Sequence, residues 1–299
     1  MRVPTNSNST QMLDRINALS ARQSNLQTQV ATGQRIFQPE DDPAAMGRVL
    51  TLNAEKLALT QFDNNTAFAM DWSNATISGL TGIKKISDRA GELATLGQGA
   101  ISNDSLSAYA AEVEQLIEQT AQLANSKLRN DYLYGGTELS GTLAHPAPFE
   151  LNTTTGLYEY WGNANQMTVP ISENSTITPG TDGTQNNGIK DFLNNLISLR
   201  NALQAGDVAA VGAARTALES SENNLVDSIS KQGAVQMRIE ISKSQRTERI
   251  DNIEKLISKE ADVDLPTAIT HLNQASLAYQ AALQSTSNIM KLSLLDYLR

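Results

Sequence analysis

The chain has 299 residues, of which 40% are hydrophobic and 5% aromatic, and its formal net charge is −9. The apolar content is sufficient for a folded core, and the scarcity of aromatic residues favours helices packed through aliphatic side chains over a β-sandwich. The acidic balance argues against nucleic acid as a partner, and the absence of cysteine excludes disulfides, thiolate metal sites and a cysteine nucleophile.

The N-terminal segment predicts an amphipathic helix. Its apolar residues recur at alternating spacings of four and three, broken only by Gln23, as do the a and d positions of a coiled coil. These residues are Met12, Ile16, Leu19, Leu26 and Val30. The polar first ten residues argue against a secretory signal peptide. No run of eighteen apolar residues occurs, so no membrane insertion is expected.

Residues 32–45, TGQRIFQPEDDPAA, predict the end of one helix and the start of the next. Gly33 ends the first helix. Asp42 is expected to cap the second helix, with Pro43 at its first position and the acidic pair Asp41 and Asp42 facing its positive end. The second helix then continues towards Leu96.

A further heptad pattern predicts a helix over residues 106–124, after a turn rich in capping residues at 102–105. The motif NDYLYGGT at 130–137 follows. We expect this motif to stop the helix at Gly135 and Gly136, directly after Tyr134, because glycine adopts the backbone conformation that ends helices.

Residues 138–188 have a different composition from the flanking segments. Half of the eight prolines fall between 146 and 179, and Thr, Asn, Gly and Ser are frequent. Two short strand-like runs, 157–161 and 166–171, flank a Gly-Asn turn at 162–163. The segment therefore predicts a small β-rich module.

Helical patterns resume at Ile189 and continue to Leu203, where Gly206 and Asp207 predict a stop followed by a new cap. A long helix is expected from Val208 to about Ile257.

The C-terminal segment 265–299 predicts a last helix, opened by Pro266. It contains no Asp, Glu, Lys or Arg from Thr267 to Met290, which is unusual for a surface helix. Its apolar stripe consists of Ile269, Leu272, Tyr279, Leu283, Met290, Leu294 and Leu298. This stripe and the N-terminal stripe predict an interface that buries both, within one chain and between copies.

The predicted fold class is mainly α: a long antiparallel coiled-coil or helical bundle formed by the N- and C-terminal regions, with the β-rich module inserted mid-chain. The predicted division is 1–45 with 265–299 as the terminal region, 46–137 with 189–264 as a central helical bundle, and 138–188 as the inserted module.

No pattern in the sequence predicts catalysis, a metal or a cofactor. A helix cap explains Asp41 and Asp42 better than a pair of catalytic carboxylates does. The only histidines, His145 and His271, are far apart in sequence, and Asp262-Val263-Asp264 lacks the other ligands of a calcium loop.

Three motifs resemble the flagellin superfamily: residues 32–45, residues 130–137, and the tail SLLDYLR at 293–299. The prolines at 39 and 43 around the acidic pair are similar to those of its hook–filament junction proteins. The resemblance covers about residues 1–137 and 189–299.

The resemblance implies a structural role at the hook–filament junction of the bacterial flagellum, outside the cell. It implies synthesis in the cytoplasm and unfolded export through the type III apparatus. The implied partners are other copies of the chain, hook-associated protein 1, flagellin and an export chaperone that binds the C-terminal region.

Two alternatives remain open at this point. One is a flagellin or minor flagellin, which would polymerise into long fibres by itself. The other is a cytosolic signalling coiled coil, which predicts charged side chains along its seams, unlike the uncharged segment 267–290.

Overall fold

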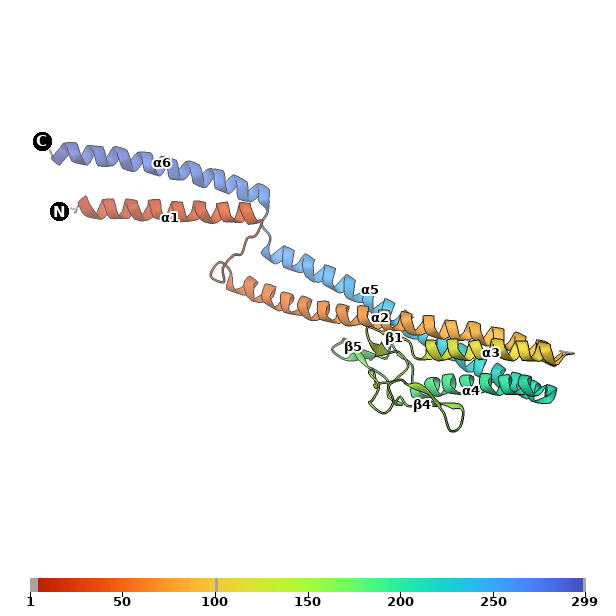
Figure 1. Cartoon of the computed structure of the whole chain (residues 1–299). Helices are drawn as coiled ribbons and strands as arrows, with labels where there is room; N and C mark the ends of the chain where they lie inside the picture. The colour runs from red at the N-terminus through yellow and green to blue at the C-terminus, as the bar shows by residue number, and fades with distance from the viewer. Residues whose placement is uncertain (1–4, 100–101, 298–299) are drawn as a thin grey trace. The chain divides into compact units, whose positions relative to one another are not determined.

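The computed structural model describes residues 5–99 and 102–297, with side chains described for 10–99 and 102–288. Its described residues form mainly helices, with short antiparallel strand pairs between the third and fourth helix (Figure 1). The predicted fold class, mainly α with a β-rich insertion, is confirmed.

The chain divides into two compact units. We call residues 1–58 with 249–299 the terminal unit, and residues 59–248 the central unit. Two long helices, α2 (Pro43–Gln98) and α5 (Val208–Ala261), contribute residues to both units.

In the terminal unit, α1 (Thr5–Thr32) packs along α6 (Leu265–Tyr297), and the start of α1 and the end of α6 lie at the same end of this pair (Figure 1). Ion pairs link the parts of α2 and α5 that belong to this unit. Glu55 binds Arg249 at 2.6 Å, and Lys56 binds Glu254 at 2.6 Å. The side chain of Ile253 is fully buried here.

In the central unit, α3 (Asn103–Ala124) packs against α4 (Gly183–Ala205) over the main hydrophobic core. Its largest fully buried side chains are Trp72, Tyr134, Phe149, Phe192, Leu80, Ile83, Leu93, Ile189, Leu193, Leu196, Leu199 and Leu203. Burial of such side chains is the main source of folding free energy, and this unit holds most of them.

The predicted break at Gly206 and Asp207 is confirmed. Gly206 ends α4 with φ of 68°, the left-handed conformation that glycine adopts without steric cost. The carboxylate of Asp207 then accepts a hydrogen bond from the Ala210 N–H at 3.0 Å and so caps α5.

The predicted start of α4 at Ile189 is wrong by two turns. The helix begins at Gly183, because Asp182 and Gln185 form a capping box. In this motif each side chain satisfies a backbone N–H at the helix start. The first two turns of α4 are polar, so apolar periodicity does not reveal them.

The prediction that Gly135 and Gly136 end α3 is also wrong. The helix ends at Ala124, and a tight hairpin of β1 (Lys127–Leu128) and β2 (Asp131–Tyr132) follows. Tyr134 is buried, and its hydroxyl donates to the Thr76 carbonyl oxygen at 2.9 Å. Gly136, at φ of 72°, lies so close to Asn163 that a Cβ would clash with it. A Cβ at Gly135 would clash with the Glu138 carbonyl oxygen, so both glycines permit close approaches of the backbone and neither ends a helix.

Both predicted strands in 138–188 are present, but they do not pair with each other. β4 (Leu157–Tyr160) pairs with β3 (Phe149–Asn152), and β5 (Val169–Ser172) pairs with β6 (Ser175–Ile177). The hairpin turns therefore lie at 153–156 and 173–174 and not at 162–163. Each strand pairs across the nearest tight turn, as short hairpins generally do.

Residues of segment 138–188 pack into the core of the central unit. Phe149 is buried, and its backbone exchanges two hydrogen bonds with the side-chain amide of Asn125, at 2.9 and 3.0 Å. The side-chain amide of Asn194 on α4 holds the backbone of Tyr158 in the same way, at 2.8 and 3.1 Å. These reciprocal bonds attach the hairpin to the helices at its main chain.

Candidate functional site: the terminal helix pair and its connectors

The described residues hold no group of three or more His, Asp or Glu placed to bind a metal ion. Of the helices in the described part of the chain, none is long and apolar enough to cross a membrane. The candidate site is a surface, formed by α1, α6 and the two segments that join them to α2 and α5.

The predicted N-terminal stripe lies on one side of α1. Met12, Ile16, Leu19, Leu26 and Val30 are all half-buried, whereas most of their neighbours are exposed. Since α6 is the helix that packs against α1, this stripe is the side that α1 presents to its partner.

The face that α6 buries consists partly of alanine. Ala268 and Ala275 are buried, and Leu272 and Tyr279 are half-buried, at spacings of four, three and four. Small residues at these positions allow two helix backbones to approach closely. Apolar periodicity found Leu272 and Tyr279 but missed the alanines, which carry a weak hydrophobic signal.

Two predicted interface residues on α6 lie beside this face and not in it. Ile269 is 46% exposed and Leu283 is 43% exposed. With Leu265, which is 44% exposed, they follow one side of the helix at spacings of four and fourteen residues. Within the described part of the terminal unit, Leu265, Ile269 and Leu283 thus form a partly exposed apolar strip. We call it the outer strip of α6.

The last three predicted interface residues cannot be placed in this way. Met290 and Leu294 belong to α6, but their side chains are outside the described residues, and so is the whole of Leu298. Their role in assembly stays a prediction.

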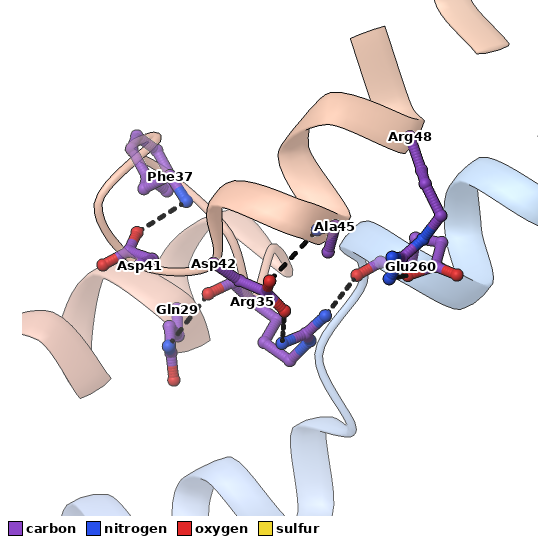
Figure 2. A network of polar contacts seen from close by, with 8 residues as sticks. All are labelled: Gln29, Arg35, Phe37, Asp41, Asp42, Ala45, Arg48 and Glu260. Atoms are coloured by element: carbon purple, nitrogen blue, oxygen red, sulfur yellow. Dashed lines mark hydrogen bonds and ion pairs between the residues drawn. The ribbon is translucent and has the colours of Figure 1, made fainter. Parts of the chain in front are cut away.

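Two short segments connect the terminal helices to the long ones (Figure 2). Residues 33–42 join α1 to α2, and residues 262–264 join α5 to α6. We call them the connectors. An antiparallel β-bridge between Gln34 and Asp262 joins the two connectors. In it, the Val263 N–H donates to the Gly33 carbonyl oxygen at 2.9 Å.

The acidic pair of the first motif lies in this region, with a separate task for each carboxylate. Asp42 caps α2, since its side chain accepts the Ala45 N–H at 3.0 Å and Pro43 is the first helical residue. Asp41 accepts the N–H groups of Phe37 and Gln38, each at 2.9 Å, and so fixes the tight turn of the first connector.

These contacts set the charges of the region. Hydrogen bonds from the amides of Gln38 and Phe37 lower the pKa of Asp41, and the amide of Ala45 lowers the pKa of Asp42, assisted by Arg35. The ion pair between Arg48 and Glu260, at 2.8 Å, lowers the pKa of Glu260. All three carboxyl groups are therefore ionised at neutral pH, and the arrangement suits fixed capping and not proton transfer.

The chain is similar to flagellar proteins in sequence. Residues 3–132 match the bacterial flagellin N-terminal helical region. Flagellar hook-associated protein 3 of Salmonella typhimurium strain LT2 is 23% identical over 98% of both chains. The flagellar filament 41 kDa core protein of Borreliella burgdorferi is 30% identical over 37% of this chain and 33% of its own. The resemblance to the flagellin superfamily that the motifs predicted is thereby confirmed.

Solved structures share the fold. A putative flagellar hook-associated protein from Vibrio parahaemolyticus superposes with a TM-score of 0.67 at 18% identity, over 74% of this chain and 100% of its own. Bacillus cereus FlgL superposes with a TM-score of 0.61 at 18% identity, over 70% of this chain and 99% of its own. The flagellar junction protein FlgL from Legionella pneumophila superposes with a TM-score of 0.56 at 12% identity, over 72% of this chain and 100% of its own.

Proposed function

We propose that this chain is a structural subunit of the bacterial flagellum that forms the junction between hook and filament. The observation that carries the proposal is the match to hook-associated protein 3, which spans 98% of both chains. The filament core protein, in contrast, matches over only 33% of its length, so a junction protein is favoured over a flagellin.

The geometry supports a structural role and not a catalytic one. The described part of the terminal unit presents an uncharged apolar side, the outer strip of α6. These partly exposed apolar side chains are available for contact with another molecule. The absence of charged residues from Thr267 to Asn288 also disfavours a signalling coiled coil, whose seams are lined by charged pairs.

The proposed partners are those that a junction subunit needs. Further copies of the chain would cover the outer strip of α6, hook-associated protein 1 would lie on the hook side, and flagellin would add on the filament side. An export chaperone would shield the C-terminal region before passage through the type III apparatus to the outside of the cell.

A deletion strain tests the role. Cells lacking this chain should keep their hooks and release flagellin into the medium, and the complementing gene should restore filaments. Hooks that carry full filaments without the chain would overturn the proposal. Purified chains that polymerise alone into long fibres would favour the flagellin alternative.

A substitution tests the surface. Leu283→Ala should destabilise the assembled state by about 2–5 kcal/mol per packed site. It should leave the melting temperature of the monomer almost unchanged, since Leu283 is 43% exposed. Leu143→Ala is the matched control, because Leu143 is also an exposed leucine but lies in segment 138–188. A sharp fall in monomer melting temperature with assembly on isolated hooks intact would show that Leu283 belongs to the monomer core.

A further inference from the structure

The connectors are the only covalent links between the terminal helix pair and the long helices. Each is short, and an isolated pair of such segments would be free to bend. Here the backbone bridge between Gln34 and Asp262 holds them together, but one β-bridge is a weak restraint. The side chain that reinforces it is that of Arg35 (Figure 2).

Arg35 donates hydrogen bonds to the end of α5 from both its backbone and its side chain. Its N–H binds the Ala261 carbonyl oxygen at 2.6 Å as part of the backbone bridge, and its Nη2 adds a side-chain bond to the Glu260 carbonyl oxygen at 2.7 Å. The last four carbonyl groups of a helix have no partner within that helix, and a positive charge is favourable at this end. Arg35 therefore caps α5 from a different segment of the chain.

The same guanidinium also reaches the start of α2. Its Nη1 lies 3.4 Å from Oδ2 of Asp42, the residue whose Oδ1 caps α2. One side chain thus joins the C-terminus of α5, the N-terminus of α2 and the first connector, to which Arg35 itself belongs. The Gln29 side chain at the end of α1 donates to the Arg35 carbonyl oxygen at 3.1 Å. This bond connects the last turn of α1 to the backbone of Arg35.

We propose that Arg35 is a positioning residue that locks the connectors, so that α1 leaves the start of α2 in one fixed direction. Without it the connectors act as a flexible joint. The planar guanidinium is needed because it supplies two separate N–H groups to two acceptors in different directions, which the single ammonium of lysine does less well. This lock is a property of the monomer and does not depend on the flagellar role.

The chain offers a matched control in Arg48. It also pairs with Glu260, through the carboxylate at 2.8 Å, but it lies on α2 and its hydrogen bond goes to α5 and not to a connector residue. Removing Arg48 therefore removes a positive charge and an ion pair from the same region while leaving the connectors bonded.

The absence of cysteine permits a direct measurement of the joint. Spin labels are attached to cysteines introduced at Ser20 on α1 and Asn53 on α2, both exposed positions of the terminal unit in the full chain. Their distance distribution is measured by double electron–electron resonance. We expect a narrow distribution for the parent and for Arg48→Ala, a distribution at least twice as wide for Arg35→Ala, and partial recovery for Arg35→Lys.

Hydrogen exchange provides a second readout. Peptides covering 33–38 and 261–266 should exchange at least tenfold faster in Arg35→Ala and at the parental rate in Arg48→Ala.

Asp42→Asn is the milder variant, since asparagine still caps α2 but no longer attracts the guanidinium. It should widen the distance distribution between the spin labels less than Arg35→Ala does. A narrow distribution in Arg35→Ala, or equal widening in Arg48→Ala, would overturn the proposal.

Discussion

Asp41 and Asp42 are adjacent in sequence and perform different tasks. The sequence predicted helix capping for the pair, and only Asp42 makes the capping bond. Asp41 instead holds the turn at Phe37 and Gln38. Helix starts can be read from residue type, whereas the contacts of a connector depend on its turn geometry.

The lowered pKa values of Asp41, Asp42 and Glu260 predict how the connectors respond to acid. A carboxyl group with a lowered folded pKa stabilises the fold above its ordinary pKa, about 4 for Asp and Glu, and loses this effect as the pH falls through the folded value. The connectors should therefore be unchanged between pH 7 and 5 and loosen only below about pH 4.

Nuclear magnetic resonance of the Phe37 and Ala45 amides follows this titration, because their N–H groups donate to the two aspartates. Asp42→Asn should abolish the acid-dependent shift at Ala45 and keep it at Phe37. A transition near pH 6 would contradict the assignment to these carboxylates.

Replacing either of two glycines of α2 by alanine should have opposite effects on stability. A Cβ at Gly79 would clash with the hydroxyl of buried Tyr134, whereas a Cβ at Gly91 would meet nothing within 4 Å. Gly79→Ala should destabilise the chain by about 1–3 kcal/mol through overpacking. Gly91→Ala should stabilise it by about 0.5–1 kcal/mol, since alanine is the better helix former. Urea unfolding measures both, and a stabilising Gly79→Ala would show that Tyr134 moves freely.

At the scale of elements, the hairpin of β3 and β4 is held in the central unit through Phe149, which is 2% exposed. Phe149→Ala should cost about 3–5 kcal/mol and lower the melting temperature of the helices together with that of the hairpin. Leu143→Ala, at a fully exposed position of the same segment, should change stability by less than about 0.5 kcal/mol. Helices that melt unchanged in Phe149→Ala would show that segment 138–188 is an independent module.

The elements differ in how far the sequence predicted them. The start of α2 at Pro43 and the stop at Gly206 follow from local chemistry, and the prediction of both was accurate. The predicted stripe of α1 is half-buried, and its part in assembly stays a prediction. The end of α3 was mispredicted because Gly135 and Gly136 serve close contacts with Glu138 and Asn163 and not a helix end. The pairing of β3 with β4 was mispredicted because the tight turn at 153–156 was not recognised. The face of α6 was predicted only in part, because buried alanine and exposed alanine look alike in a sequence.

At the scale of the molecule, buried side chains are distributed unevenly. The buried hydrophobic residues described in the terminal unit are Ile36, Ala45, Ile253, Ala261, Ala268 and Ala275, and four of these six are alanines. The central unit contains Trp72, Tyr134, Phe149 and Phe192. Since stability follows buried apolar area, the terminal unit is expected to open at a lower free energy.

We predict that a chain spanning residues 59–248 folds alone and melts cooperatively within a few degrees of the full chain. Limited proteolysis of the full chain should remove α1 and α6 first and leave this body. Rapid cleavage within 106–124 while α1 and α6 remain intact would contradict the prediction.

The order in which the helices pair along the chain constrains how the protein folds. α3 pairs with α4, α2 contacts α5 through ion pairs such as Lys84 with Glu222, and α1 pairs with α6. These pairings are nested, like the stem of a hairpin. Each pair that forms shortens the loop that the next must close, and every doubling of an open loop costs about 0.6 kcal/mol in chain entropy. Folding should therefore proceed outward from α3 and α4, and in pulse-labelling hydrogen exchange the amides of α1 should gain protection last.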